Sequence, residues 1–423
     1  MVRWVWRPGK RTVLRLRDRG LPVAWLQGRL QSLGYRVGPI DGVYDFLTED
    51  CICSLQRQYG LKVDGIAGPQ VMELLRDSQL QAGSVLQAVW GVIQGDAPIK
   101  VKRRLSEGLY SRLTGLFLHC FSIEEAGNIV GGIPEVIYSL AESTQVRLVP
   151  VISNLQHDIY DELALEALLR HRHARGRLLD MVKRIVADPK IDGVALDFQK
   201  VAIGYGRRFT ALVEGARKLA ADYHKSMYMV LVPNDGHREA LSKHVDNRLW
   251  ASLPDRVILR ASLEHVSGTP GPKMGLQWVQ NQLTRVYRYL PAWKLMVILP
   301  VDGIAWRVDG NLREYKYLSY DDARRLAYQH QAKIRWDMVE KVPFYDFMGD
   351  EGRCRVWYEN SDSIRPKLEW LNRQPLTGIV IEPMGGEDFR IWEKVDKTYR
   401  VQGMGDQTRS GNIYRDSHRC PGI

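Results

Sequence analysis

The sequence predicts an α/β fold, a parallel (β/α)8 TIM barrel with a small insertion, preceded by a small three-helix domain. Eight short runs rich in Val, Ile and Leu alternate with longer amphipathic stretches between residues 84 and 398, which is typical of parallel strands with covering helices. Residues 13–80 show helical spacing interrupted by glycines instead. A length of 423 residues accommodates one barrel and one small domain.

The segment 13–80 divides into three helices joined by two turns. The apolar positions of the first helix are three and four residues apart and share one face: Val23, Leu26, Leu30 and Leu33. A turn at 39–42 leads to a second helix with Thr48 as its expected N-cap, and a turn at 63–69 leads to a short third helix. Both turns contain Asp-Gly followed by Val or Ile. They form a weak internal repeat.

These residues resemble the peptidoglycan-binding domain 1 family. The matching positions are Leu26-Gln27, Leu30, Leu33-Gly34-Tyr35, Asp41-Gly42-Val43-Tyr44, Thr48, Leu55-Gln56, Gly60-Leu61, Val63-Asp64-Gly65-Ile66 and Gly68-Pro69. The resemblance implies a module that docks on cell-wall glycopeptide, with Tyr44 as a carbohydrate-binding candidate. The chain departs from the family at Asp45-Phe46-Leu47, Cys51 and Cys53. A three-helix adaptor without a ligand is the alternative.

Eight expected strands follow from the apolar runs of the larger region. The runs are Ser84–Val92, Gly115–Cys120, Val146–Val151, Gly193–Phe198, Met227–Val232, Arg256–Leu259, Lys294–Leu299 and Thr377–Ile381. Helical patterns lie between them, for example over 204–221. Residues 1–12 form a basic amino-terminal segment. Residues 399–423 are rich in Gly, Ser, Arg and Asp, and we expect them to be a disordered basic tail.

The net charge of +11 is concentrated at the two ends of the chain. Residues 1–20 carry +6 and residues 400–423 carry +2, which leaves +3 for the remainder. Proteins that bind nucleic acid usually carry a basic stripe on the folded surface, so we expect no nucleic-acid partner. Basic ends suit an anionic cell-wall polymer; the alternative is that they serve solubility alone. No apolar run approaches the roughly 18–20 residues of a membrane span, and no signal-peptide pattern is present, so we expect synthesis in the cytoplasm.

The five cysteines predict neither a disulfide framework nor a metal site. They are odd in number, scattered and without a C-x-x-C pair. His171 and His173 lie in a run of Arg and His that is typical of a solvated helix face. We therefore expect free thiols, no metal and no other cofactor.

The fourth apolar run ends in polar residues that indicate a site. Strand alternation places Ala195, Asp197 and Gln199 on the same side. In a TIM barrel, function belongs to the carboxyl ends of the strands, and a carboxylate that faces the barrel axis is costly to bury without partners. Asp197 is therefore a site candidate. The alternative is an Asp hydrogen-bonded to neighbouring strands.

The stretch 192–199 resembles the Asp-Gly-x-Asp-x-Asp-x-Glu motif of glycoside hydrolase family 18. Further segments resemble its spore-cortex-lytic branch in order and spacing: Gly275–Leu290, Pro300 with Trp306, Leu318–Tyr320, Ile334–Asp337, Val356–Glu359 and Gly385–Trp392. The family's chemistry is substrate-assisted: a Glu protonates the glycosidic oxygen while the N-acetyl carbonyl of the substrate attacks the anomeric carbon. The resemblance covers nearly all of residues 84–397.

Compared with that family, the site of this chain is degenerate. Asp192 and Asp197 are retained, but the position of the acid holds Gln199, and a carboxamide cannot donate and regain a proton near neutral pH. Four further positions depart, namely those of the middle Asp, the acetamide-binding Tyr, the Asp that follows this Tyr and the Trp that floors the sugar: Ala195, Ser262, Leu263 and Glu382. We therefore expect that hydrolysis has been lost. The alternative is an active glycosidase that cleaves N-acetylglucosamine-containing glycan with Glu264 or Glu382 as substitute acid.

Together these inferences favour a glycan-binding protein of the cell wall or spore envelope of a spore-forming bacterium. The expected partner is peptidoglycan or another N-acetylglucosamine-containing glycan, with Glu264, Trp306 and Trp357 as further binding candidates. Packing at the barrel rim is the alternative for the two Trp residues, and a structural coat protein is a third hypothesis. An open aromatic cleft beside Gln199 would favour glycan binding there, whereas a pocket filled by Arg260 or closed over Glu382 would argue against it.

Overall fold

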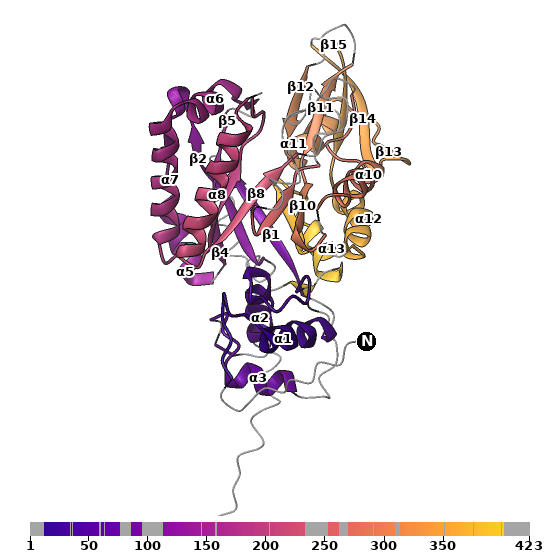
Figure 1. Ribbon diagram of the computed structural model, residues 1–423. Coiled ribbons are helices and arrows are strands. Elements are labelled where there is room, and N and C mark those ends of the chain that lie inside the picture. Colours follow the sequence, from indigo (N-terminus) through magenta and orange to yellow (C-terminus); the bar gives the residue numbers. More distant parts are fainter. Residues whose placement is uncertain are drawn as a thin grey trace, which may run out of the picture. The chain divides into compact units, whose positions relative to one another are not determined.

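The computed structural model describes residues 12–76, 86–94 and 113–401, apart from 34, 36, 59–60, 63, 145, 157–158, 203, 233–252, 262–269, 291, 309–313, 351, 375 and 399. Contacts between residues divide the chain into two compact units, one of which contains the three-helix module and the other the barrel (Figure 1). The two units are described separately.

The module consists of α1 (Leu21–Ser32), α2 (Phe46–Gln58) and α3 (Pro69–Arg76). The face predicted for the first helix is confirmed, because its four apolar side chains lie in one buried cluster. The predicted N-cap of the second helix is wrong by one turn. Asp45 precedes the helix and its carboxylate accepts the N–H of Thr48 at 2.8 Å, so Asp45 has the capping role and Thr48 lies inside the first turn.

Each Asp-Gly turn of the module is held by a buried glutamine. Nε2 of Gln27 donates to Oδ1 of Asp41 at 3.0 Å, and Oε1 of Gln27 accepts from the N–H of the next glycine at 2.9 Å. Gln56 makes the same two bonds to Asp64 and to its following glycine, at 2.8 and 3.0 Å. The two turn glycines have φ of 72° and 68°, a conformation that side chains disfavour. The weak repeat in the sequence is therefore a repeated hydrogen-bonded clasp.

Replacing Gln56 by leucine should open the second clasp. Because the substitution leaves the buried N–H of Gly65 without its acceptor, we expect local stability to fall by about 1–3 kcal/mol. Hydrogen exchange at the Gly65 amide in the full chain measures this loss. Gln31→Leu, at an exposed position of α1, is the matched control and should leave the exchange rate unchanged. Equal protection in both variants would contradict the role of the clasp.

Eight parallel strands form the closed barrel. In order around it they are β1 (Leu86–Gln94), β2 (Gly115–Ile123), β4 (Arg147–Ser153), β7 (Gly193–Asp197), β8 (Ser226–Leu231), β9 (Arg256–Leu259), β10 (Leu295–Pro300) and β16 (Gly378–Glu382). β16 pairs with β1, and β1 pairs with β2, which closes the ring. All eight coincide with the predicted apolar runs, so the (β/α)8 barrel is confirmed. Their burial on both faces explains why the runs do not alternate with polar residues.

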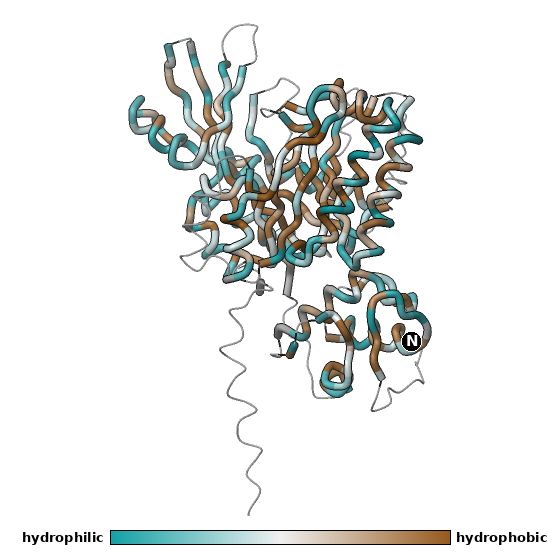
Figure 2. The backbone as a smooth tube through the Cα atoms, turned by 90° about the vertical axis from the view of Figure 1, so that its left-hand side faces the viewer, coloured by the Kyte–Doolittle hydropathy of each residue, from teal (hydrophilic) through white to brown (hydrophobic). Residues whose placement is uncertain are grey.

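Helices cover the outside of the barrel (Figure 1). They are α5 (Glu135–Thr144), α6 (Glu162–Arg170), α7 (Arg172–Ala187), α8 (Gly206–Asp222), α10 (Leu276–Val286), α12 (Ser361–Asn372) and α13 (Ile391–Thr398). In α8, Phe209, Leu212 and Val213 are buried, as the pattern over 204–221 predicts. Figure 2 shows hydrophobic residues concentrated along the barrel strands, and many hydrophilic ones along the helices.

Several short elements complete the description. β3 (Ile129–Gly131) follows η2 (Glu125–Gly127) and pairs with β2, β5 (Leu155–Gln156) pairs with β6 (Ile159–Tyr160), and η3 (Ala292–Lys294) precedes β10. β17 (Arg400–Val401) pairs in parallel with β1. The prediction of disorder from residue 399 onward is therefore wrong for β17. Residues 1–11 and 402–423 lie outside the described residues.

A five-stranded antiparallel sheet is inserted between β10 and α12. Its strand order is β12 (Tyr315–Leu318), β11 (Gly303–Arg307), β15 (Gly352–Tyr358), β14 (Val342–Gly349) and β13 (Arg335–Asp337). Helix α11 (Tyr320–Gln329) belongs to the same insertion, and its Ala323 and Ala327 pack in one cluster with Tyr345 and Tyr358 of the sheet. The predicted small insertion is thus confirmed as a layer of one sheet and one helix.

Four cysteines lie in the described residues and none forms a disulfide: Cys51, Cys53, Cys120 and Cys354. Burial raises the pKa of the Cys120 thiol to about 12, so this side chain stays protonated at neutral pH. Within the described part of the chain, no helix is both long enough and apolar enough to cross a bilayer.

Candidate functional site

A network of polar side chains lies at the carboxyl ends of β7, β9 and β16. Asp197 ends β7, and its side chain is fully buried. Its carboxylate accepts hydrogen bonds from the Tyr160 hydroxyl, Gln199 Nε2 and Arg260 Nη2, at 3.0, 2.8 and 3.2 Å. These donors occupy most of the positions at which a carboxylate can accept a hydrogen bond. Asp197 is therefore engaged by the protein itself.

Gln199 is fixed by hydrogen bonds on both its side chain and its backbone. Its Nε2 donates to Asp197 Oδ1 and also to the carbonyl oxygen of Val230, at 2.8 and 3.2 Å. The side chain of Asn154 accepts the N–H of Gln199 at 2.9 Å and donates to its carbonyl oxygen at 3.0 Å. An ionised carboxylate could not replace Nε2 as donor. The carboxamide therefore suits this position better than an acid does.

Arg260 links two carboxylates that belong to different strands. Its Nη2 lies 3.2 Å from Oδ2 of Asp197, and its Nη1 lies 2.5 Å from Oε2 of Glu382, the last residue of β16. Gln94, at the end of β1, donates to Oε1 of Glu382 at 3.0 Å. The Arg260 side chain is 9% exposed. A buried cation thus fills the space between Asp197 and Glu382.

Burial and charge determine the protonation of this network. Burial favours a raised pKa for the Glu382 carboxyl, but the adjacent Arg260 guanidinium outweighs it and holds that pKa below its usual value. Burial lowers the pKa of His119, which lies in the same environment, and the nearby carboxylates offset this only in part. At neutral pH Glu382 is therefore an ionised acceptor and His119 is an uncharged imidazole.

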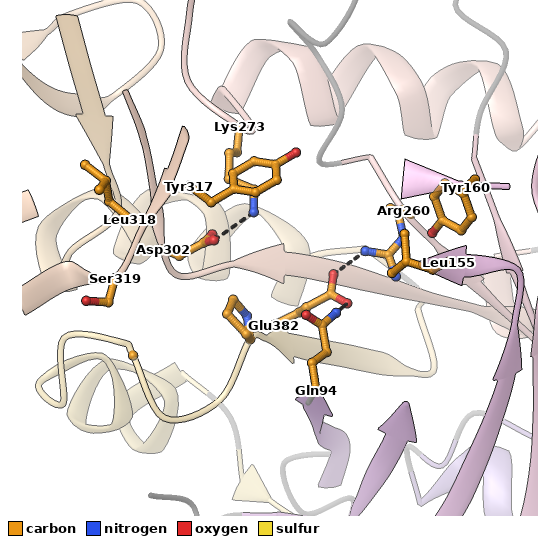
Figure 3. A pocket seen from close by; sticks show the side chains of 12 residues that line it. Gln94, Leu155, Tyr160, Arg260, Lys273, Asp302, Tyr317, Leu318, Ser319 and Glu382 are labelled. Carbon is orange, nitrogen blue, oxygen red and sulfur yellow. Dashed lines mark hydrogen bonds and ion pairs between the residues drawn. The ribbon is translucent and has the colours of Figure 1, made fainter. Parts of the chain in front are cut away.

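A cavity of about 300 Å³ opens beside the network (Figure 3). Its lining residues come from the barrel strand ends, the loops and the insertion: Gln94, Leu155, Tyr160, Arg260, Lys273, Asp302, Tyr317, Leu318, Ser319, Glu382, Pro383 and Gly386. Asp197 and Gln199 are not among them. The cavity therefore has Arg260 and Glu382 in its wall, whereas the position of the family's acid does not reach it.

A second ion pair lies in the wall of the cavity. Lys273 Nζ is 2.8 Å from Oδ2 of Asp302 and 4.2 Å from the centre of the Tyr317 ring. Figure 3 shows the lysine ammonium group between the carboxylate and the ring. Burial raises the pKa of the Asp302 carboxyl, and Lys273 opposes that effect. The insertion supplies the aromatic wall, since Tyr317 belongs to β12.

Comparison with known proteins identifies the amino-terminal module. Residues 19–75 match the family model described as "Putative peptidoglycan binding domain". The N-acetylmuramoyl-L-alanine amidase CwlM of Mycobacterium tuberculosis is 43% identical over 67 residues, and this match covers 15% of the chain and only 16% of the amidase. The similarity to the amidase is thus confined to a short segment.

The barrel resembles glycan-degrading enzymes. The cortical fragment-lytic enzyme of Bacillus subtilis is 22% identical over 296 residues, which are 68% of this chain and 68% of that enzyme. A chitinase from Chromobacterium violaceum has the same fold, with a TM-score of 0.64 and 19% identity over 74% of this chain and 98% of the chitinase. The chain thus resembles these enzymes in its barrel and matches a peptidoglycan-binding family in residues 19–75. Both resemblances inferred from the sequence are thereby confirmed.

The family 18-like barrel brings together only part of the predicted site. Asp197, Gln199 and Glu382 meet as described above. Asp192 does not join them, because it is exposed at the amino end of β7, where its carboxylate accepts the N–H of Leu148 at 2.9 Å. Its role is to connect β7 with β4 at the end opposite to the cavity. Ser262 and Glu264 lie outside the described residues.

The aromatic binding candidates are packing residues, which corrects three assignments. Trp306 is 1% exposed, and its indole N–H donates to the carbonyl oxygen of Gly271 at 2.8 Å. Trp357 is buried beside Phe344. Tyr44 is fully buried in the module and donates to the carbonyl oxygen of Gly65 at 2.7 Å. None of these rings offers a face on which a sugar could stack.

Residues missed by sequence reasoning complete the family 18-like site. Gln94 and Asp302 lie at the ends of β1 and β10, so the rule that barrel sites gather at strand ends could have found both. Tyr160 and Lys273 lie away from the ends of the barrel strands, and no spacing in the sequence indicates them. Arg260 was considered only as a possible obstruction, and it is the centre of the network.

Proposed function

We propose that this protein binds cell-wall glycan through its amino-terminal module and that its barrel no longer hydrolyses glycan. A cell-wall role follows from the matched module and from the similarity of the barrel to a cortical fragment-lytic enzyme. The finer assignment, to the spore envelope and without catalysis, is ours. It rests above all on Arg260, which bridges Asp197 and Glu382.

Two features of the site argue against the family's mechanism in this chain. That mechanism needs a free Asp to orient the acetamido group, and Asp197 is engaged by three donors of the protein. It also needs a protonated acid, and Gln199 cannot supply a proton. The Arg260 guanidinium fills the space around Asp197. A pocket filled in this way argues against glycan binding beside Gln199.

The alternative is an active glycosidase with Glu382 as substitute acid. A general acid works best when its pKa is close to the working pH. Because Arg260 holds the pKa of Glu382 below its usual value, this carboxyl is ionised at neutral pH and makes a poor acid. Glu264 lies outside the described residues. Release of reducing ends from cortex peptidoglycan by the unmodified chain, and its loss in Glu264→Gln, would support Glu264 as the substitute acid.

Restoring the acid alone should not restore hydrolysis. In Gln199→Glu, the new carboxyl lies buried beside Asp197, so it is protonated and donates to that carboxylate, and it does not reach the cavity, whose lining does not include residue 199. We expect release of reducing ends from cortex peptidoglycan to stay within about twofold of the unmodified chain, against the 10²–10⁴-fold typical of a working general acid. Gln329→Glu, at an exposed position of α11, is the control. A clear gain in Gln199→Glu alone would overturn the proposal.

Binding is tested separately from catalysis. The full chain should sediment with purified peptidoglycan, and a chain that lacks residues 1–80 should lose most of this association. If neither chain sedimented, the protein would be the structural coat protein of the third hypothesis. Reducing-end release by the unmodified chain would support the glycosidase alternative instead.

A further inference from the structure

The small net charge of +3 over residues 21–399 conceals a strong separation of charge. Helices α7 and α8 together contain nine arginines and lysines against three carboxylates, a net charge of +6. The rest of residues 21–399 therefore carries −3. We propose that the outer face of these two helices binds a linear phosphodiester polymer of the cell wall. The inference rests on the proposed function for the cell-wall location only.

The nine cations, which we call the basic face, are accessible to a partner. They are Arg172, Arg175, Arg177, Lys183, Arg184, Arg207, Arg208, Arg217 and Lys218. All of them are exposed except Arg175, which is partly buried. Among the described residues, Arg217 alone of the nine contacts a carboxylate, that of Asp255 at 3.4 Å. The charge of the basic face is therefore largely uncompensated within the described part of the chain.

The basic face includes one edge of α7. The two helices lie side by side on the outside of the barrel (Figure 1). A Cβ atom at Gly215 of α8 would lie 3.1 Å from the Leu179 side chain of α7, so the helices pack together at this point. Arg172 and Lys183 are seven positions before and four positions after Leu179, and both spacings return to the same side of a helix. These two cations therefore lie along the edge of α7 that faces α8.

The facing edge of α8 carries a matching pair. Arg208 and Lys218 are seven positions before and three positions after Gly215. Both helices connect consecutive parallel strands of the barrel, so they run in the same direction, with the two arginines at one end of the seam and the two lysines at the other. At 1.5 Å per residue, the two ends are about 15 Å apart. A ligand that contacts both ends is therefore an extended anion with repeated charges.

The stability of the two helices does not explain these cations. Neither helix has an acidic residue in its first turn, and cations lie there instead: Arg172 in α7, and Arg207 and Arg208 in α8. Positive charge at the amino end of a helix opposes the helix dipole and is unfavourable. Because an anionic partner would compensate this charge, binding explains the pattern better than folding does.

The side chains of the basic face favour a phosphodiester polymer as the partner. Seven of the nine are arginines, whose planar guanidinium groups can donate two parallel hydrogen bonds to a phosphate. The exposed large apolar side chains include none on α7 or α8, both of which are fully described. The face therefore offers neither a stacking surface for bases nor an apolar anchor for a membrane. A polymer of phosphodiesters without bases or acyl chains fits this chemistry.

Binding of the full chain to labelled poly(glycerol phosphate), followed by fluorescence anisotropy, tests the inference. We expect the affinity to fall at least about tenfold between about 50 and 200 mM salt. A seam variant carries four substitutions: Arg172→Gln, Lys183→Gln, Arg208→Gln and Lys218→Gln. At low salt it should bind at least about tenfold more weakly than the unmodified chain.

A control variant loses the same number of positive charges at exposed positions elsewhere in the barrel unit. Its substitutions are Arg325→Gln, Lys333→Gln, Arg365→Gln and Lys397→Gln. It should bind within about twofold of the unmodified chain, because its changes lie outside the basic face. Asp180→Asn combined with Glu214→Gln removes two exposed carboxylates from α7 and α8. This variant should bind about threefold more tightly, an effect that misfolding could not produce.

The outcomes separate this inference from the proposed function. Equal affinities of the seam and control variants would overturn the inference and assign polymer binding to the basic ends of the chain. Tighter binding of single-stranded DNA, or of phosphatidylglycerol vesicles, would overturn the choice of partner. Peptidoglycan freed of phosphodiester polymers should sediment the seam variant and the unmodified chain equally, since the module binds it. If neither chain sedimented, the proposed function would fail, whereas the comparison of polymer affinities would still decide the inference.

Discussion

Replacing Arg260 by methionine is expected to lower the free energy of unfolding of the barrel by about 3–5 kcal/mol at pH 7. Methionine has a similar length, so the variant keeps most of the packing and loses the charge. Asp197 and Glu382 would then be two buried carboxylates without their shared cation. Hydrogen exchange of the β7 and β16 amides measures the loss in the full chain, where two units need not unfold together.

The pH dependence of this variant tests the cause of its instability. In the unmodified chain the folded pKa of Glu382 is below its usual value, so its stabilising contribution is present above about pH 4.5 and is lost as the pH falls through the folded pKa. Without Arg260, the burial of Glu382 is no longer opposed and raises the pKa of its carboxyl. The variant should therefore gain stability relative to the unmodified chain as the pH falls from 7 to 5.

Two further variants serve as controls for Arg260→Met. Arg365→Met removes an exposed arginine of α12 and should cost less than about 1 kcal/mol. Adding Asp197→Asn and Glu382→Gln to Arg260→Met removes the unpaired charges and should restore most of the stability. A loss below about 1 kcal/mol in Arg260→Met, or no recovery in the triple variant, would contradict the view that Arg260 serves as a structural clamp.

The sequence predicts the architecture well because the barrel is encoded locally. Each buried parallel strand is a short apolar run, and each covering helix has its own apolar face, so all eight strands could be placed without knowledge of their neighbours. The module was equally accessible, because its two Asp-Gly turns mark the helix ends. The N-cap was misplaced at Thr48 because Asp45, three positions earlier, is also a good capping residue, and the sequence does not show which side chain accepts the first free N–H.

The site was harder to predict because its contacts are not local. The family motif located Asp197 and Gln199, but the partners of Asp197 include Tyr160 and Arg260, which are 37 and 63 residues away. Arg260 in turn binds Glu382, 122 residues further along the chain. The Trp candidates failed for a related reason. A sequence gives the type of an aromatic residue but does not show whether its ring is exposed. Trp306 and Trp357 lie together in a buried cluster of the inserted sheet.

A further ion pair, between Lys367 and Glu359, joins the inserted sheet to the helix layer of the barrel. Lys367 of α12 is fully buried, and its ammonium pairs with Glu359, the residue that follows β15. Ser363 donates to the other oxygen of this carboxylate at 2.6 Å. The backbone N–H of Glu359 in turn donates to the carbonyl oxygen of Asp302 at 3.1 Å. The pair thus supports the segment from which Asp302 enters the cavity.

Lys367→Met should therefore destabilise the barrel by about 3–5 kcal/mol, because it leaves Glu359 as an uncompensated buried charge. Exchange of the amides of α12 and β15 measures this loss, and Lys183→Met, at an exposed position of α7, is the control. Adding Glu359→Gln keeps an acceptor for Ser363 and removes the charge, so it should recover much of the stability. No recovery of exchange protection in the double variant would contradict this role of the ion pair.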